Sequence, residues 1–563
     1  MTRHSERSEE SHKRRLGTLA GSFASLRMTW FVAAFAVVLI GPILLRQKNE
    51  LPSNTAQTLV IISPHNEAIR YEFSRAFDEY YFQKHGQHVR IDWRTPGGTS
   101  EIARYLGSEY QAAFENYWTH RLQRPWSAEV QTVFDNPKAP QDGSPGAQAR
   151  AEFLSSNVGC GIDLFFGGGS FDFIQQANAG RLVDCGAVAA HPELFNDKVI
   201  PQKLGGEPYW DPQGRWIGVC LSSFGICYNT DLLRLLKIQD APRQWSDLGD
   251  PRYAGEIALA DPNQSGSVGK AFEMLIQQQM LMLVRQISEG HLEGTTPSPG
   301  EKNQEDRMVA LGWANAMQLI MKISANSRYF TDSATKVPFD VEEGNAAAGM
   351  CIDFYGRFQS ESVRKPDRTS RMEYITPEGG SSVGVDPIGL LRGAPHPELA
   401  REFIEFVISP EGQKLWDWKI GAPGGPAKYA LRRLPILPSL YAPEYTAFRS
   451  DPEVQPYAQA GAFIYHDQWT SPLFRSISFV VRVMCIDPHD ELRDAWRALI
   501  AANFPPQATA AFGDVSKVDY AAAGGPIRKA LASPVEELKL AKVLDESFSA
   551  QYRHAAELAR EGK

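Results

Sequence analysis

The pattern that most constrains the fold is a recurring unit of buried strand, short loop and helix. Residues 58–63 (TLVIIS) form a continuous apolar run that predicts a buried strand. A helix is then expected from Glu67, with Asn66 as its cap and Gly86 at its end. Residues 89–93 alternate between apolar and polar types, which predicts a second strand. A strand, a helix and a strand in this order indicate a parallel α/β unit.

The same unit recurs further along the chain. Residues 162–166 (IDLFF) and 256–260 (EIALA) predict two more strands, and each is followed by a loop and a helix. Residues 346–352 (AAAGMCI) predict another buried strand. The C-terminal third instead has the spacing of amphipathic helices, and Ser533 to Glu536 form a capping box that begins a final helix. We therefore expect an α/β protein with a helical C-terminal extension.

One segment near the start predicts the compartment. Residues 28–45 carry no charge, and their 18 residues are near the lower limit for a membrane-spanning helix. Six basic and three acidic residues precede this segment, so the chain after Glu50 is expected outside the cytoplasm. We predict an uncleaved transmembrane anchor at 28–46. Residues 1–27 are then a cytoplasmic tail, or they precede a true start at Met28. A cleavable signal peptide is the alternative.

Composition and missing motifs exclude several classes of protein. A net charge of −8 without a basic stripe is not typical of nucleic-acid binding. The sequence contains no dinucleotide or P-loop fingerprint, no G-x-S-x-G elbow and no H-E-x-x-H motif. The six cysteines lie far apart and form no zinc-binding pattern. These observations favour a binding protein over an enzyme and predict no cofactor.

Three loops follow predicted strands at the place where open α/β sheets bind ligands. They are residues 63–67, 167–170 and 263–267. Glycine lets backbone N–H groups approach a ligand, and a helix start stabilises a nearby anion by about 0.3–1 kcal/mol. Any one of these loops alone is more often a plain turn.

The order of these segments resembles the family 1 extracellular solute-binding proteins, and within them the branch that includes the ferric-iron-binding proteins. The resemblance runs through most of residues 58–420. It is carried by LVIISPHNEAIRYEFSRAFDEYY, GIDLFFGGGSFDFIQQANAGRLV, DLGDPRYAGEIALADPNQSGSVGKAF and ELAREFIEFVISPEGQKLW. It implies a two-lobed periplasmic-binding-protein-like fold of type II, with the ligand held in a cleft. The expected parts are lobe one at 56–221 and 382–434, lobe two at 222–381, and a helical extension at 435–563 packed on lobe one.

The resemblance also implies a function. The chain is expected to be the extracytoplasmic substrate-binding component of an ABC-type importer, tethered to the cytoplasmic membrane, with permease and ATPase subunits as partners. Ferric-binding relatives hold iron with a histidine, a carboxylate and two adjacent tyrosines. His65 and Tyr355 match the histidine and one tyrosine. Phe354 replaces the other tyrosine, and Gly168 stands where the carboxylate is expected, which leaves Asp353 as a substitute.

We therefore expect a small anionic solute, phosphorylated or carboxylated, held by hydroxyl and backbone N–H donors. Two alternatives stay open. One is ferric iron, or an iron–anion complex, bound by His65, Tyr355 and Asp353. The other is a tethered sensory ectodomain or an enzyme on the same fold. The predicted ligand-binding residues are His65, Asn66, Thr99, Ser100, Gly168, Gly169, Ser170, Ser265, Gly266, Ser267, Ser333 and Tyr355.

Overall fold

The computed structural model describes residues 57–288, 304–367 and 369–563. The predicted anchor at 28–46 and the tail before it lie outside these residues. None of the helices in the described part of the chain combines the length and the apolar character that a membrane crossing requires.

The first lobe is built on a sheet in which the strands follow the order β14-β7-β13-β3-β1-β2, with β4 paired to β13. β1 is parallel to β2 and to β3, whereas β13 is antiparallel to β3 and β7. β7 and most of β13 are buried, because helices cover both faces of the sheet. The strands are β1 (Gln57–Ile62), β2 (Val89–Arg94), β3 (Leu164–Phe166), β4 (Leu182–Val183), β7 (Ile217–Ser222), β13 (Gly384–Leu391) and β14 (Leu434–Pro435).

The helices of the first lobe begin mostly after strands, as the sequence pattern predicted. The side chain of Asn66 accepts a hydrogen bond from the backbone N–H of Ile69, at 3.1 Å, and so caps the first of them. These helices are α2 (Glu67–His85), α3 (Thr99–Asn116), α4 (Ala128–Val133), α5 (Pro145–Ser155), α6 (Ser170–Ala179), α7 (Ala187–Ala190), α13 (Pro397–Ile408) and α14 (Pro410–Asp417). A separate hairpin joins β5 (Lys203–Leu204) to β6 (Glu207–Pro208).

The second lobe is built on a five-stranded sheet in the order β10-β9-β11-β8-β12. β9 is parallel to β10 and β11, and β8 is antiparallel to β11 and β12. The strands are β8 (Phe224–Asn229), β9 (Ile257–Ala260), β10 (Ser327–Thr331), β11 (Ala348–Ile352) and β12 (Met372–Ile375). The helices are α8 (Thr230–Leu235), α9 (Gly266–Ser288), α10 (Gln304–Ala325), α11 (Lys336–Glu343) and α12 (Asp353–Ser362).

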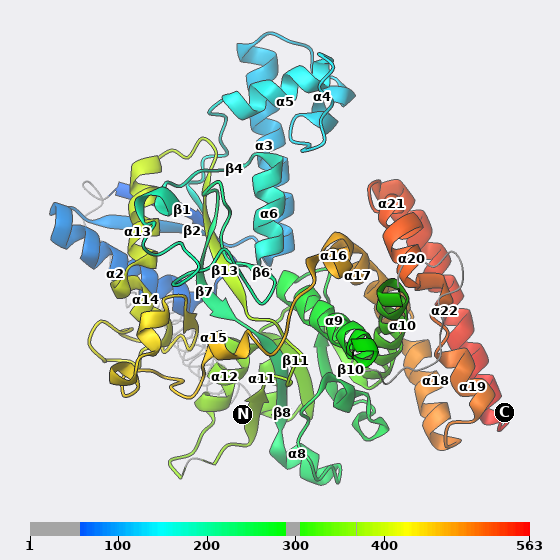
Figure 1. Cartoon of the computed structure of the whole chain (residues 1–563). Coiled ribbons are helices and arrows are strands. Elements are labelled where there is room, and N and C mark those ends of the chain that lie inside the picture. The colour runs from blue at the N-terminus through cyan, green and yellow to red at the C-terminus, as the bar shows by residue number, and fades with distance from the viewer. Residues whose placement is uncertain (1–56, 289–303, 368) are drawn as a thin grey trace, which may run out of the picture. The chain divides into compact units, whose positions relative to one another are not determined.

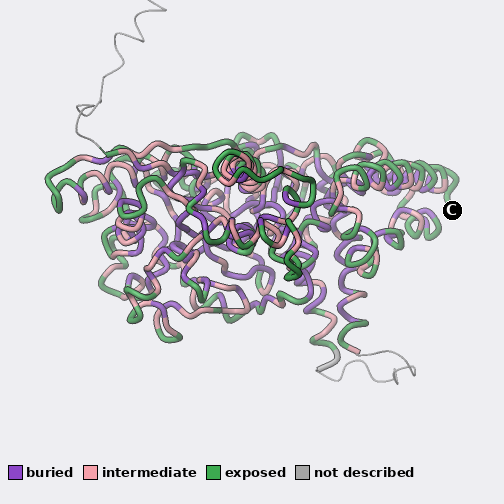
Figure 2. Tube along the Cα trace, turned by 90° about the horizontal axis from the view of Figure 1, so that it is seen from above, coloured by how far each residue is buried: buried purple, intermediate pink, exposed green. Residues whose placement is uncertain are grey.

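The chain crosses between the two sheets twice. β7 runs through Ser223 directly into β8, and residues 376–383 lead back from β12 to β13. Each lobe has its own hydrophobic core, one around β1, β3, β7 and β13 and the other around β9 and β11. Buried residues run through the interior of the fold, and exposed residues gather at its margins (Figure 2). Two short connections between two separate cores allow the lobes to move about a hinge, so that a cleft between them can open and close.

The C-terminal extension does not pack as expected. Residues up to Ala460 stay against the core of the first lobe, but apolar side chains from Phe463 to Ala559 belong to the core of the second lobe. The prediction that this extension packs on lobe one is therefore wrong for most of its length. The physical reason is the face of α10: Trp313 is buried there, and its indole N–H donates to the carbonyl oxygen of Val518, at 2.8 Å.

We call residues 463–563 the C-terminal region. Some of its helices lie beside α9 and α10, and the others pack on those helices from the outside (Figure 1). They are α16 (Asp467–Thr470), α17 (Phe474–Val481), α18 (His489–Ala501), α19 (Pro506–Phe512), α20 (Tyr520–Ala522), α21 (Arg528–Ala530) and α22 (Pro534–Arg560). The short helix α15 (Pro456–Gln459) precedes the region, on the side of the first lobe.

Candidate functional site

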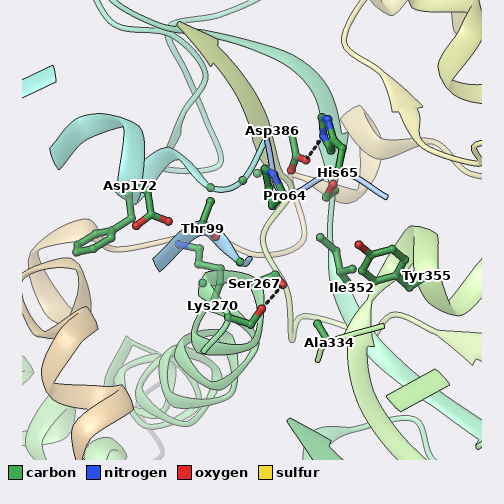
Figure 3. A pocket seen from close by; sticks show the side chains of 18 of the residues that line it. Pro64, His65, Thr99, Asp172, Ser267, Lys270, Ala334, Ile352, Tyr355 and Asp386 are labelled. Carbon is green, nitrogen blue, oxygen red and sulfur yellow. Dashed lines mark hydrogen bonds and ion pairs between the residues drawn. The ribbon is translucent and has the colours of Figure 1, made fainter. Parts of the chain in front are cut away.

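A cavity of about 510 Å³ lies between the two lobes. Its wall comes from loops that follow β1, β2 and β3 of the first lobe and β9, β10 and β11 of the second. Several of its lining side chains are drawn in Figure 3. Ligands of α/β proteins bind at this end of the strands, so the topology alone makes the cavity the candidate site.

Three long helices begin at the cavity, two from the first lobe and one from the second. The residues that precede or begin them are Gly98 for α3, Gly169 for α6 and Gly266 for α9, and all three line the cavity. The first N–H groups of a helix have no partner inside the helix and carry partial positive charge. The cavity thus combines N–H donors from both lobes.

Gly168 shows why glycine is needed in the loop before α6. Its φ angle is +121°, and a Cβ atom at this position would lie 2.1 Å from Cγ2 of Thr99. No other residue could adopt this conformation without moving the start of α3. The loop and the helix therefore approach each other closely at the cavity wall.

The two lobes touch at the start of α9. A Cβ atom on Gly98 would lie 2.6 Å from the carbonyl oxygen of Gln264. A Cβ atom on Gly266 would lie 2.8 Å from Oγ1 of Thr99 and 3.1 Å from Oδ2 of Asp172. These approaches leave no room for side chains, so the lobes are closed on each other at this edge of the cavity.

The structure brings together nearly all the predicted ligand-binding residues. Of the twelve, all line the cavity except Ser100. Ser100 is the second residue of α3, and successive residues of a helix point about 100° apart, so its neighbours Thr99 and Glu101 line the cavity while Ser100 does not. That the others bind a solute stays a prediction.

A buried cluster of four charged or polar side chains forms one end of the cavity. Arg433 donates from Nη1 to Nε2 of His65, at 3.1 Å, and from Nη2 to Oγ of Ser222, at 3.2 Å. It also pairs with Asp386, whose Oδ2 lies 3.6 Å from His65 Nε2, and Figure 3 shows Asp386 pointing towards His65. The guanidinium lies 4.0 Å from the ring centroid of Phe354. The pair therefore has both ionic and aromatic support.

Burial fixes the charge of His65. Loss of hydration lowers the pKa of His65 to about 4, and the positive charge of Arg433 acts in the same direction. The ring is neutral at neutral pH, and because Nε2 accepts from Arg433 we assign its proton to Nδ1. Nδ1 finds no hydrogen-bond partner among the described residues. It is a buried donor that a solute oxygen could satisfy.

A second charged group, at another part of the wall, surrounds Lys270. Its Nζ lies 2.9 Å from Oε1 of Glu207 and 2.9 Å from Oε2 of Glu273. Burial acts to lower the pKa of Lys270, but the two carboxylates outweigh it and raise that pKa well above its usual value. Lys270 is therefore a permanent cation with two anionic partners.

Asp172, in the first turn of α6, is a third titratable group at the wall. Its side chain is nearly buried, and burial raises its pKa to about 7, although a hydrogen bond with Thr99 acts in the opposite direction. The carboxyl group is thus part protonated near neutral pH.

Two of the side chains considered for iron, Asp353 and Tyr355, are poorly suited to bind a metal cation. Asp353 is fully buried and accepts from Nη2 of Arg357, at 2.9 Å, and it does not line the cavity. Burial raises the pKa of Tyr355 to about 12, which disfavours a tyrosinate. Within the described ranges, no three His, Cys, Asp or Glu side chains are placed to hold a metal ion.

Sequence reasoning missed Asp386, Arg433, Lys270 and Phe474, all of which line the cavity. Asp386 had a signal, because it is a charged residue inside the otherwise apolar strand β13. Arg433 and Phe474 lie beyond residue 420, where the resemblance ends. No local spacing connects them to the loops of the site.

Comparison with known proteins gives a family match and distant relatives. Residues 158–436 match the family model described as bacterial extracellular solute-binding protein. An uncharacterised protein of Haemophilus influenzae is 24% identical over 285 residues, which are 50% of this chain and 67% of that protein. The phosphoglycerate transport regulatory protein of Salmonella typhimurium is 23% identical over 288 residues. That match covers 51% of this chain and 58% of the Salmonella protein, which is less than two thirds of its length.

Two solved structures match this chain at low similarity. The periplasmic binding protein AfuA of Actinobacillus pleuropneumoniae, with fructose-6-phosphate bound, has 16% identity and a TM-score of 0.43. The match covers 78% of this chain and 97% of that chain. Iron-bound HitA of Pseudomonas aeruginosa also has 16% identity and a TM-score of 0.43, with coverages of 76% and 99%.

Proposed function

We propose that this chain, which belongs over residues 158–436 to the bacterial extracellular solute-binding proteins, captures a small anionic solute between its two lobes. The observation that carries the proposal is the meeting of the N-termini of α3, α6 and α9, from both lobes, at one cavity. Helix N-termini and glycine loops are ready-made anion sites. Hydroxyl groups of Thr99, Ser170 and Ser267 lie in the same wall and add donors.

The charged side chains indicate what else the solute carries. Among the described residues that line the cavity, the cations are Lys270 and Arg433, and both have carboxylate partners. The attraction for an anion therefore rests on N–H and hydroxyl donors more than on a free cation. Glu207, Asp172 and Asp332 add oxygen acceptors to the wall. Such acceptors suit hydroxyl groups, so we propose a phosphorylated or carboxylated solute that also carries hydroxyls.

We place this activity outside the cytoplasm, with an ABC permease and ATPase as partners and with residues 28–46 as the membrane anchor. The proposal contains no catalytic step and no cofactor. Its first test is thermal unfolding of the full-length chain with inorganic phosphate, phosphoglycerate, fructose-6-phosphate, citrate and ferric citrate. An organic anion present at about 100 times its Kd should add about 2.7 kcal/mol of stability. A panel in which no organic anion raises the unfolding temperature would contradict a capture role.

Ferric iron is the weaker candidate because two of its three proposed ligands contact an arginine and the third is a protonated phenol. Nε2 of His65 faces the guanidinium of Arg433, at 3.1 Å, and a metal cation at that nitrogen would meet a fixed positive charge. Asp353 is bonded to Arg357, and Tyr355 is protonated at neutral pH.

Titration with ferric citrate is therefore expected to produce no tyrosinate-to-iron absorption band in the visible range. Absorbance spectra of wild type and Tyr355→Phe, recorded side by side, check this. A strong band in the wild type that disappears in Tyr355→Phe would establish iron as the cargo and overturn the anion proposal.

Ser265 and Ser267 provide a direct test of the anion site. Their hydroxyl groups lie 3.0 Å apart and bond each other, so together they offer the solute about one strong hydrogen bond. A hydrogen bond to a charged group contributes about 1.5–3 kcal/mol. The double variant Ser265→Ala, Ser267→Ala is expected to weaken binding of the stabilising anion by about 10- to 150-fold, measured by isothermal titration calorimetry.

The matched control is Ser155→Ala, at the exposed end of α5, which should bind as the wild type does. If the double variant and the control bind the anion with equal affinity, these two hydroxyl groups do not contribute to the site.

A further inference from the structure

We propose that the C-terminal region supplies a wall of the binding cavity, and that its Phe474 closes the cleft by stacking on Phe171 of the first lobe. The solute itself rests on the proposed function, whereas the contact between the two rings does not.

The ring contact spans the cleft. Phe171 follows Ser170 at the start of α6, and Phe474 begins α17, which is seated on the second lobe. Their ring centroids lie 4.4 Å apart at an interplanar angle of 35°, and both residues line the cavity. Phe474 is 9% exposed, so most of its ring is covered. An aromatic pair that joins one lobe to a segment carried by the other must separate when the lobes part.

Phe474 is held in place from the side of the second lobe. A Cβ atom on Gly269 of α9 would lie 3.1 Å from Cζ of Phe474, so the ring rests on the helix where a side chain is missing. Nδ2 of Asn263 donates to the carbonyl oxygen of Ser478, at 3.1 Å. Oγ of Ser478 donates to the carbonyl oxygen of Pro262, at 3.2 Å. These bonds fasten α17 to the loop that leads into α9.

The C-terminal region also positions Lys270. Oε1 of Glu273 accepts from the hydroxyl groups of Tyr465, at 2.8 Å, and Thr470, at 2.5 Å. Its other oxygen pairs with Lys270, whose Nζ lies 3.7 Å from the ring centroid of Tyr465. Gln277 donates to Thr470, at 2.7 Å. The positions of two lining side chains, Phe474 and Lys270, are thus set by residues that follow 462.

The closed form of the protein, in which the two lobes meet, should therefore depend on the C-terminal region. Aromatic pairs in proteins contribute enough beyond their buried area to shift an equilibrium by about 2- to 13-fold. Removing either ring should raise the open fraction by that factor. The rings also wall off one side of the cavity, which limits the size of the solute on that side.

Hydrogen exchange measured by mass spectrometry on the full-length chain, without added solute, tests the contact. The variant Phe474→Ala should speed exchange of the peptide 168–175 in the first lobe by about 2- to 13-fold, although the substitution lies in the C-terminal region. Phe171→Ala should have the same effect on peptide 263–270 of the second lobe. The double variant should exchange no faster than either single variant, because both break one contact. Phe474→Leu, which keeps an apolar side chain, should have a smaller effect.

Phe504→Ala is the matched control, because it removes a ring from the C-terminal region that does not line the cavity. It should leave peptide 168–175 unchanged, which separates closure from a general loosening of the region. Unchanged exchange of that peptide in Phe474→Ala, or additive effects in the double variant, would overturn the inference. If Phe474→Ala does not fold, Phe171→Ala still decides, since Phe171 is only part buried. If the variant exchanges faster but no anion of the panel binds, the result would contradict the proposed function and still support the contact between the two rings.

Discussion

Replacing Arg433 with methionine is expected to lower the free energy of unfolding by about 3–5 kcal/mol, because it leaves a buried carboxylate without its partner. Arg433 is 1% exposed and pairs with Asp386, which is also buried. The variant also removes the donor to His65 and the contact with the ring of Phe354. Urea denaturation followed by circular dichroism measures the loss.

A second substitution separates the charge from the packing. Adding Asp386→Asn to Arg433→Met removes the unpaired carboxylate, so the double variant should recover part of the lost stability. The control Arg401→Met breaks an exposed ion pair with Glu398 and should cost at most about 1 kcal/mol. If Arg433→Met costs no more than that control, the buried pair does not stabilise the fold.

The pH dependence of the pair follows from the pKa of Asp386. Burial acts to raise this pKa, but Arg433 and His65 outweigh it, and the pKa lies below its ordinary value. A carboxylate with a lowered pKa in the folded state contributes stability above its unfolded pKa, and that stability is lost as the pH falls through the folded pKa. In the wild type this contribution should therefore hold from neutral pH down to about pH 4. In Arg433→Met the buried Asp386 has lost the charge that lowers its pKa, so it takes up a proton at a higher pH, and the difference between wild type and variant should shrink as the pH falls towards 4.

Local patterns were enough to predict the α/β units. The strand expected at 58–63 is Gln57–Ile62, and the helix expected from Glu67 to Gly86 is Glu67–His85. The strands expected at 256–260 and 346–352 are Ile257–Ala260 and Ala348–Ile352. Burial and turn signals repeat within a few residues, so a single sequence contains them. The loops at the ends of these strands meet at one cavity because parallel strands share an edge.

Contacts between residues far apart in the sequence could not be predicted from it. Arg433 meets His65 across 368 residues, and Phe474 meets Phe171 across the cleft. The stripes on the C-terminal helices predicted that each has an apolar face, but a stripe does not say which lobe covers it. Asp353 is a different case, because its partner Arg357 lies one turn away in the same helix, and this i, i+4 spacing was a local signal against Asp353 as a ligand.

Asp172→Asn should stabilise the protein at pH 8 by up to about 4 kcal/mol, with little effect at pH 4. The pKa of Asp172 is about 7 in the folded chain, against 3.8 for an exposed aspartate, because burial disfavours the charged form. The folded state therefore holds a proton that the unfolded state releases between these two values. Stability from this group is present at low pH and is lost as the pH rises towards 7, at about 1.36 kcal/mol per pKa unit. Asparagine never pays this penalty, since it has no charged form.

The measurement is urea denaturation of wild type and Asp172→Asn at pH 4, 6 and 8, with Asp197→Asn, at an exposed position, as the control. Comparing each variant with wild type at one pH cancels His65, which becomes charged on unfolding at acid pH in all of them. The advantage of Asp172→Asn should grow with pH, whereas that of the control should stay near zero. An advantage that is the same at pH 4 and pH 8 would mean that the carboxyl group is ionised in the cleft throughout. The start of α9 would then meet a fixed negative charge, and an anionic solute would have to bind beside it.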